Sequence, residues 1–388
     1  MNFKPCALLS VILLSSFVSL YAQTSTDGRQ GNTITTAVPF LLITPDARSG
    51  SMGDVGAAIP SDVNATHWNP AKLAFVKQES GYGLSYSPWL QKLVPDINLA
   101  YINGYYRIDD RNVIGGSLRY FSLGEIQLVD ANQTSLGIYS PNELAVDGTF
   151  ARNFGQNFSL GTSLRFIYSN LSSGQIDGGQ QTKPGTAVAA DVSAFYTKNR
   201  DLFGNAATVS FGMDISNIGT KMSYVDGGQK YFLPTNMRIG GASTFHIDEF
   251  NDFTFALDVN KLLVPTTPQY DSNGRIKAGK DPNRSVPAGI FGSFFDAPRG
   301  GSEELQEVSI ATGVEYWYSQ QFAVRAGYFY ENPNKGNRQY LTLGLGLKYN
   351  IVDIDFSYLI ANQQKSPLAN TLRFSLLFNF GSTGQSRL

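Results

Sequence analysis

The sequence predicts an all-β protein, a fourteen-stranded antiparallel transmembrane β-barrel that follows an N-terminal hatch segment. Three observations predict it: alternating strand-length segments, an alternation of short and long gaps between them, and the absence of proline from the segments. In the last segment Leu372, Phe374 and Leu376 fall on one face, whereas Arg373 and Ser375 fall on the other. A period of two with one apolar face is typical of a half-buried strand. In a membrane barrel the apolar face meets lipid and the polar face meets the lumen.

The predicted strands share this alternation and contain none of the 17 prolines. Proline has no N–H to donate to a strand ladder, so its exclusion supports the assignment. The segments are 81–87, 98–108, 112–121, 144–153, 158–168, 187–198, 207–218, 236–247, 253–259, 308–317, 322–330, 340–349, 351–359 and 372–380.

The gaps between the segments indicate how the barrel is oriented. Even-numbered gaps are tight, as at 109–111 and 319–321, whereas odd-numbered gaps are long, above all 260–307. Antiparallel barrels with both termini in the periplasm have short turns on that side and long loops outside. A soluble sandwich has no reason to segregate its loops in this way. The sequence therefore predicts long extracellular loops.

Charged residues inside the segments lie opposite the apolar face. A charge on the lipid face costs up to about 2–4 kcal/mol at mid-membrane, so a lumen-facing position is expected. Seven acids and six bases predict mutual pairing across the lumen, the alternative being a polar conduit for ions or solutes. These residues are Asp147, Asp191, Asp214, Asp258, Glu315, Asp353, Asp355, Arg119, Arg165, Arg238, Arg325, Lys348 and Arg373.

The N-terminus is typical of a secretory signal peptide that is cleaved near Ala22. Lys4 supplies a positive charge, and an apolar stretch runs from Ala7 to Leu20. A single membrane anchor is the alternative interpretation. The only cysteine, Cys6, lies inside this segment, so the mature chain is expected to have no disulfide and no cysteine-ligated metal. Beyond it, no apolar run approaches the roughly 18 residues of a membrane helix.

A Gly-rich segment precedes the first strand and is predicted to enter the lumen as a hatch. Within it, Asp46 and Arg48 are expected to pair with lumen charges, Trp68 is a large apolar anchor, and Asn69 before Pro70 favours a turn. The hatch is interpreted as a structural plug or as a ligand gate. The predicted organisation is a signal peptide (1–22), the hatch (23–79), the barrel (80–380) and a C-terminal tail (381–388).

The longest loop contains an apolar cluster that is a candidate partner-binding site. Its first residues predict a short helix opened by proline at its start, which would display Ile290, Phe291, Phe294 and Phe295 on one side. Such a cluster is either folded onto the barrel rim or offered to a partner.

Trp89 and Leu90 in the first long gap form a second candidate for partner binding. A tryptophan near a membrane interface is also a common girdle residue, so both interpretations stay open.

No catalytic arrangement is predicted. The two histidines, His67 and His246, are accompanied by no Ser/His/Asp order, no metal-ligand cluster and no phosphate loop. We therefore expect no enzyme, no cofactor and no metal site. The formal net charge of −1 implies no nucleic-acid partner.

Two stretches of the hatch carry a resemblance to a known family. Ile43 to Asp54 and the Asn-Pro-Ala element within His67 to Ala74 resemble the N-terminal hatch of the FadL-like fourteen-stranded outer-membrane proteins. Together with Tyr86 to Leu90 and Leu93 to Tyr101, the match resembles the PorV (LptO) family of the type IX secretion system.

This resemblance implies a secretion component in the outer membrane of a Gram-negative bacterium. Members of the family receive cargo with a C-terminal signal domain as it leaves the giant translocon barrel, and pass it to an attachment complex containing the sortase-like PorU. The resemblance also favours the partner-binding interpretation of the apolar cluster in the longest loop. The alternatives are a FadL-like transporter of hydrophobic small molecules, which the charged lumen disfavours, and a lipid A deacylation factor. Deacylation is disfavoured because His246 is predicted at the periplasmic rim.

Overall fold

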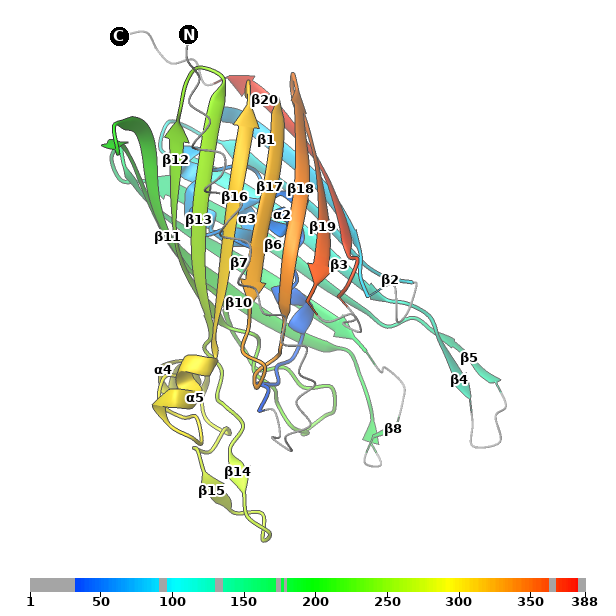
Figure 1. Cartoon of the computed structure of the whole chain (residues 1–388). Helices are drawn as coiled ribbons and strands as arrows, with labels where there is room; N and C mark the ends of the chain where they lie inside the picture. Colours follow the sequence, from blue (N-terminus) through cyan, green and yellow to red (C-terminus); the bar gives the residue numbers. More distant parts are fainter. Residues whose placement is uncertain are drawn as a thin grey trace. The chain divides into compact units, whose positions relative to one another are not determined.

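A closed antiparallel β-barrel forms the body of the chain (Figure 1). The structure is a computed structural model, and it describes residues 32–90, 96–129, 135–171, 176–177, 180–362 and 368–382. The predicted signal peptide lies outside the described residues. The fourteen barrel strands are β1 (Gln78–Pro88), β2 (Ile97–Arg107), β3 (Asn112–Leu123), β6 (Asn142–Asn153), β7 (Phe158–Asn170), β10 (Gly185–Leu202), β11 (Asn205–Gly219), β12 (Asn236–His246), β13 (Asn251–Leu262), β16 (Val308–Tyr318), β17 (Phe322–Tyr330), β18 (Gln339–Tyr349), β19 (Val352–Ala361) and β20 (Leu372–Ser382).

The predicted fold is confirmed strand by strand. Neighbours in sequence pair antiparallel around the barrel, and β20 pairs with β1 to close it. The main difference is in length, because β10 extends to Leu202 and joins β11 through the two-residue turn Phe203-Gly204. Pro88 is the last residue of β1, a strand end where the missing N–H is tolerated.

The two ends of the barrel differ in the length of their connections. We call the end with the short connections the turn rim and the end with the long connections the loop rim. In the described residues of the loop rim, the connections carry three two-stranded hairpins and two short helices. These are β4 (Ile126–Val129) with β5 (Ser135–Tyr139), β8 (Ile176–Asp177) with β9 (Gln180–Gln181), β14 (Gln269–Tyr270) with β15 (Ile276–Ala278), α4 (Val286–Gly292) and α5 (Gly301–Gln306).

None of the helices in the described ranges is both long enough and apolar enough to cross a membrane. Along the barrel strands, side chains alternate between the two faces, as in β18. Leu341 and Leu343 are exposed on the outside, whereas Tyr340 and Thr342 are buried inside. The exposed apolar face is the one that a bilayer would cover.

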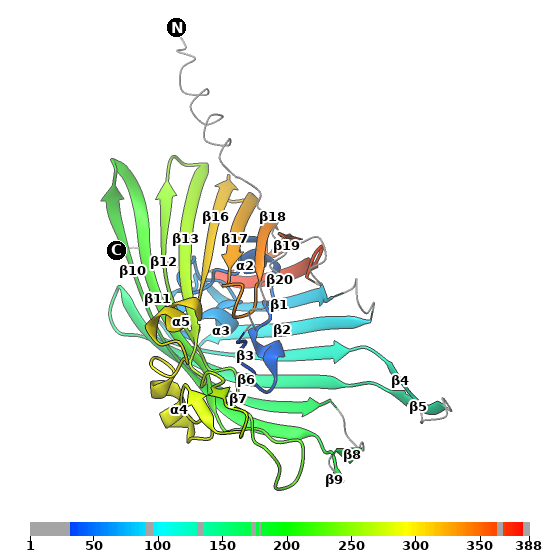
Figure 2. The same ribbon diagram turned by 60° about the horizontal axis from the view of Figure 1, so that its bottom comes forward.

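Residues 32–77, which we call the hatch, run through the lumen from the loop rim to the turn rim. At its start the amide of Asn32 donates to the carbonyl of Asn334 in a loop-rim connection. Near its end Asn153, the last residue of β6, donates to the carbonyl of Ala74. The hatch contains four short helices, and Figure 2 shows α2 and α3 within the ring of strands. The helices are η2 (Pro39–Leu42), α2 (Ala47–Ser51), α3 (Ala65–Trp68) and η3 (Pro70–Phe75).

Glycines on the inner wall let the hatch backbone approach the strands directly. A Cβ added to Gly327 of β17 would lie 2.0 Å from the carbonyl carbon of Met52, and one added to Gly212 of β11 would lie 2.0 Å from the oxygen of Ala57. Only glycine permits such a contact. The hatch is therefore fitted against the wall by its main chain.

Buried charges tie the hatch to the wall. The guanidinium of Arg325 lies 2.6 Å from a carboxylate oxygen of Glu315 and 2.6 Å from one of Asp355. Arg48 of the hatch lies 2.8 Å from Glu315 and 2.8 Å from Asp62. Glu315 and Arg325 are register partners on adjacent strands. These ion pairs join neighbouring strands of the wall, or the wall and the hatch. The sequence predicts pairing across the lumen, but the hatch occupies that space.

Candidate partner-binding site

The connection between β13 and β16, residues 263–307, is the longest at the loop rim, and we call it the long loop. It contains the hairpin β14–β15 and the helices α4 and α5. Pro287 stands in the first turn of α4, where its missing N–H costs no hydrogen bond, as predicted. Gly289 of α4 lies against Phe232 of a neighbouring connection, since a Cβ there would be 2.6 Å from the Phe232 ring. The helix is thus packed onto the rim through its glycine.

Two of the four predicted apolar residues of the long loop are strongly exposed. Phe291 is 76% exposed and Phe295 is 77% exposed, whereas Ile290 and Phe294 are half-buried. The helix ends at Gly292, so Phe294 and Phe295 follow it and do not extend its face. The predicted single helical face is therefore corrected: the cluster divides into an exposed pair and a supporting pair. Phe294 contributes to the support, with its ring centroid 5.7 Å from the Nζ of Lys261.

A third exposed apolar side chain, which the sequence pattern does not predict, lies on α5. Leu305 is 76% exposed. It stands alone between polar residues, so no periodic pattern points to it. The carboxylate of Glu304 beside it accepts from the amides of Asp296 and Ala297, at 2.7 and 2.9 Å. This contact joins α5 to the segment that carries the exposed phenylalanines. We call Phe291, Phe295 and Leu305 the apolar surface of the long loop.

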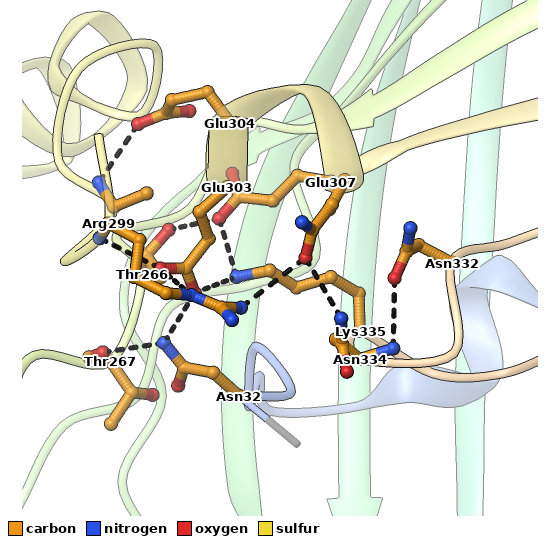
Figure 3. A network of polar contacts seen from close by, with 12 residues as sticks. Asn32, Thr266, Thr267, Arg299, Glu303, Glu304, Glu307, Asn332, Asn334 and Lys335 are labelled. Carbon is orange, nitrogen blue, oxygen red and sulfur yellow. Dashed lines mark hydrogen bonds and ion pairs between the residues drawn. The ribbon is translucent and has the colours of Figure 1, made fainter. Parts of the chain in front are cut away.

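A buried polar network holds α5 to the rim, and Figure 3 shows its contacts. Lys335 of the connection between β17 and β18 lies 2.7 Å from Glu303 and 3.0 Å from Glu307. Lys261, near the end of β13, lies 2.7 Å from Glu307. The Nδ2 of Asn32 donates to Glu303 at 2.9 Å. Three separate parts of the chain therefore meet at α5, and the hatch is one of them.

The carboxyl of Glu303 is expected to make this attachment sensitive to acid. Burial by itself raises its pKa, but hydrogen bonds from Lys335 and Asn32 hold the pKa of Glu303 at about 2, below its ordinary value of 4.5. The folded form thus binds a proton more weakly than the unfolded form. Its stabilising contribution is complete above pH 4.5 and is lost as the pH falls toward 2.

We therefore expect hydrogen exchange at residues 296–307, corrected for its intrinsic pH dependence, to accelerate as the pH falls through this range. Glu303→Gln lacks the carboxylate and should show faster exchange already at neutral pH and a flatter profile. An unchanged profile in Glu303→Gln would assign the acid sensitivity to another group.

Within the second candidate pair, Trp89 packs against the hatch. Trp89 is half-buried against an apolar cluster formed by hatch and wall residues, and the guanidinium carbon of Arg373 lies 5.8 Å from its ring centroid. Leu90 is half-buried and has a positive φ of 51°. Residues 91–95 lie outside the described part of the chain. Trp89 therefore supports the hatch, whereas the apolar surface lies on the long loop.

The predicted hatch residues form a compact internal arrangement. Trp68 is buried and its Nε1 donates to a carboxylate oxygen of Asp46 at 2.6 Å. Asn69 caps η3 by accepting from the amide of Ala71, and Pro70 is the first residue of that helix. Arg48 pairs with the wall carboxylate of Glu315, as predicted.

The prediction for Asp46 is corrected, because its bonds stay within the hatch. Besides Trp68, its carboxylate accepts from the amide of Ser49 at 2.8 Å and so caps α2. A capping carboxylate satisfies amides that a helix start leaves without a partner, which decides its orientation.

Comparison with known proteins places the chain in a family. The sequence model described as "Type IX secretion system protein PorV" matches residues 25–269, more than half of the chain. No curated protein matches it.

Solved structures share the barrel fold. The P. putida toluene transporter TodX has a TM-score of 0.50 and 11% identity over 87% of this chain and 98% of its own. A TodX deltaS2S3 mutant, a monoaromatic hydrocarbon channel, has a TM-score of 0.51 and 14% identity over 86% and 99%. At these identities the likeness concerns the fold alone. The fourteen-stranded barrel of the chain and its match to the PorV sequence model place it in the outer membrane. The chain belongs to the PorV family of type IX secretion system proteins.

Proposed function

We propose that this chain is a non-enzymatic outer-membrane component of type IX secretion that binds secreted proteins on its long loop. It takes cargo by the C-terminal signal domain as the cargo leaves the giant translocon barrel, and passes it to a PorU-type attachment complex. The loop rim faces the cell exterior in this proposal. Family membership supports the secretion role, and the exposed apolar surface of the long loop carries the assignment of the contact.

The apolar surface has the properties of an interface anchor. Phe291, Phe295 and Leu305 each leave about three-quarters of the side chain exposed. Full burial of such a side chain in a partner contributes about 1.5–3 kcal/mol. The polar network around Glu303 fixes the loop before binding, which reduces the ordering cost of association. Large exposed apolar groups on an ordered support are typical of protein–protein contacts.

A transporter of hydrophobic small molecules is the second candidate, because TodX, which shares the fold, is a toluene transporter. One cavity inside the barrel argues against it. A cavity between hatch and wall has a volume of about 70 Å³, and its lining includes Asp54, Arg238 and Arg338. An apolar cavity that binds benzene in another protein is about 150 Å³. The charged lining and the small volume of this cavity between hatch and wall favour the secretion role.

The triple variant Phe291→Ser, Phe295→Ser, Leu305→Ser tests the proposal. We expect it to fold normally, because these side chains are exposed. The amount of cargo cross-linked to it in intact cells should be at least about tenfold lower than for the wild-type protein. Cargo with an uncleaved signal domain should accumulate. The measurement is quantitative mass spectrometry of cross-linked complexes purified from outer membranes.

The matched control is Tyr349→Ser, which removes an aromatic side chain that is 72% exposed at the turn rim. It should leave cargo capture unchanged. Folding of both variants is checked by the heat-dependent mobility of the barrel in gels. Normal capture and processing of cargo by the correctly folded triple variant would contradict the assignment of the contact to this surface.

A further inference from the structure

A second feature of the loop rim is a cavity of about 650 Å³. This volume lies in the range of ligand-binding pockets, about 300–1,000 Å³. Its walls come from three segments: the hatch at Thr35, the connection 220–235, and the part of the long loop that includes residues 264–283. The Phe232 carbonyl accepts from the amide of Ala37 at 2.9 Å, which fixes the hatch to one wall.

The charged side chains that line the cavity are two lysines, Lys221 and Lys230, and one carboxylate, Asp281. The Nζ of Lys221 lies 4.2 Å from the ring centroid of Phe232, so the ammonium group is supported by an aromatic face. Burial, and then the positive charge of Lys230, lower the pKa of Lys221. The cavity therefore has an excess of positive charge, and an anionic ligand would relieve it.

The hatch contributes a short backbone segment beside this charge. Residues 33–36 read Thr-Ile-Thr-Thr, residue types with high β-propensity. Among the described residues, their peptide groups make no hydrogen bond to another backbone group, although Asn32 and Ala37 on either side are both bonded to loop-rim carbonyls. We call residues 33–36 the strap. It is held at both ends, and its peptide groups have the donors and acceptors that an added strand would need.

We propose that this cavity binds an extended polypeptide segment with acidic side chains, which pairs with the strap as an added strand and places its carboxylates at Lys221 and Lys230. The inference rests on the proposed function, since secreted cargo supplies the segment. Strand addition gives affinity through main-chain hydrogen bonds, whereas side-chain contacts give specificity. The strap and the lysines supply these two parts on one cavity.

The test uses the whole mature protein in lipid nanodiscs and a short fluorescent peptide of alternating Thr and Asp, amidated at its C-terminus. We expect saturable binding in fluorescence anisotropy, and no comparable binding of the matched peptide of alternating Thr and Lys. The double variant Lys221→Glu, Lys230→Glu should weaken binding of the acidic peptide by at least about tenfold, because two attractive contacts become repulsive. Equal binding of both peptides, or no effect of the double variant, would overturn the proposal.

Two further measurements make the test specific. Lys277→Glu changes an exposed lysine of β15 outside the cavity lining and should leave affinity unchanged. Hydrogen exchange at residues 33–36 should slow when the acidic peptide is added, because strand pairing protects amides. Lysine-dependent binding without this protection would contradict strand addition.

Failure of this inference can be told apart from failure of the proposed function. Normal cargo capture in cells by Lys221→Glu, Lys230→Glu would reject the cavity as the site and leave the secretion role standing. Peptide binding by a protein that captures no cargo would retain the cavity and reject the role.

Discussion

Replacing Arg325 with methionine is expected to lower the apparent free energy of unfolding of the barrel by about 3–5 kcal/mol. The guanidinium is 1% exposed and lies 2.6 Å from carboxylates of both Glu315 and Asp355. Methionine fills part of the same volume but leaves Asp355 without its ion-pair partner in a buried site. The measurement is the urea concentration at which the folded barrel, identified by its mobility in gels without heating, disappears.

A second substitution and an exposed pair provide the controls. Adding Asp355→Asn to Arg325→Met should recover part of the lost stability, because the remaining group no longer carries a charge. Lys183 and Asp226 form an ion pair between largely exposed side chains, so Lys183→Met should change stability by less than about 1 kcal/mol. If Arg325→Met were as mild as Lys183→Met, the buried pairs would not hold the wall and the hatch together.

Replacing Gly327 with alanine is expected to displace the hatch. The added Cβ would lie 2.0 Å from the carbonyl carbon of Met52 and 2.1 Å from the amide nitrogen of Gly53, and backbone cannot rotate away as a side chain can. Overpacking of this kind costs about 1–3 kcal/mol, and we expect the upper end. A displaced hatch should also open the lumen, so single-channel conductance in planar bilayers should rise together with the loss of stability.

Gly148 of β6 is the matched control, because nothing lies within 4 Å of a Cβ added there. Gly148→Ala makes the same glycine-to-alanine substitution in a strand, at a position that does not contact the hatch. It should leave conductance at the wild-type level. Wild-type conductance and stability in Gly327→Ala would mean that the hatch moves freely and is no fixed plug. That result would favour the transporter alternative.

Only part of the exposed surface of the long loop can be predicted from the sequence. Phe291 and Phe295 can be predicted as candidates, because they belong to a cluster of apolar residues within a loop. Leu305 cannot be predicted in this way, since a single leucine on a short polar helix forms no periodic pattern. Its exposure depends on how α5 is anchored by Glu303 and Glu307 to lysines that are distant in sequence. Contacts of this separation leave no local pattern.

The strands, their order and the inward direction of the charges can be predicted from the residues alone. Alternation and proline exclusion are local consequences of ladder geometry and of the lipid around the barrel. Which charges pair, and that the hatch starts at the loop rim, becomes visible only in the folded barrel. The same holds for the contacts of wall glycines with the hatch backbone and for the position of the strap beside a cationic cavity. These features depend on distances between segments that only the closed barrel brings together, so no local pattern of residues encodes them.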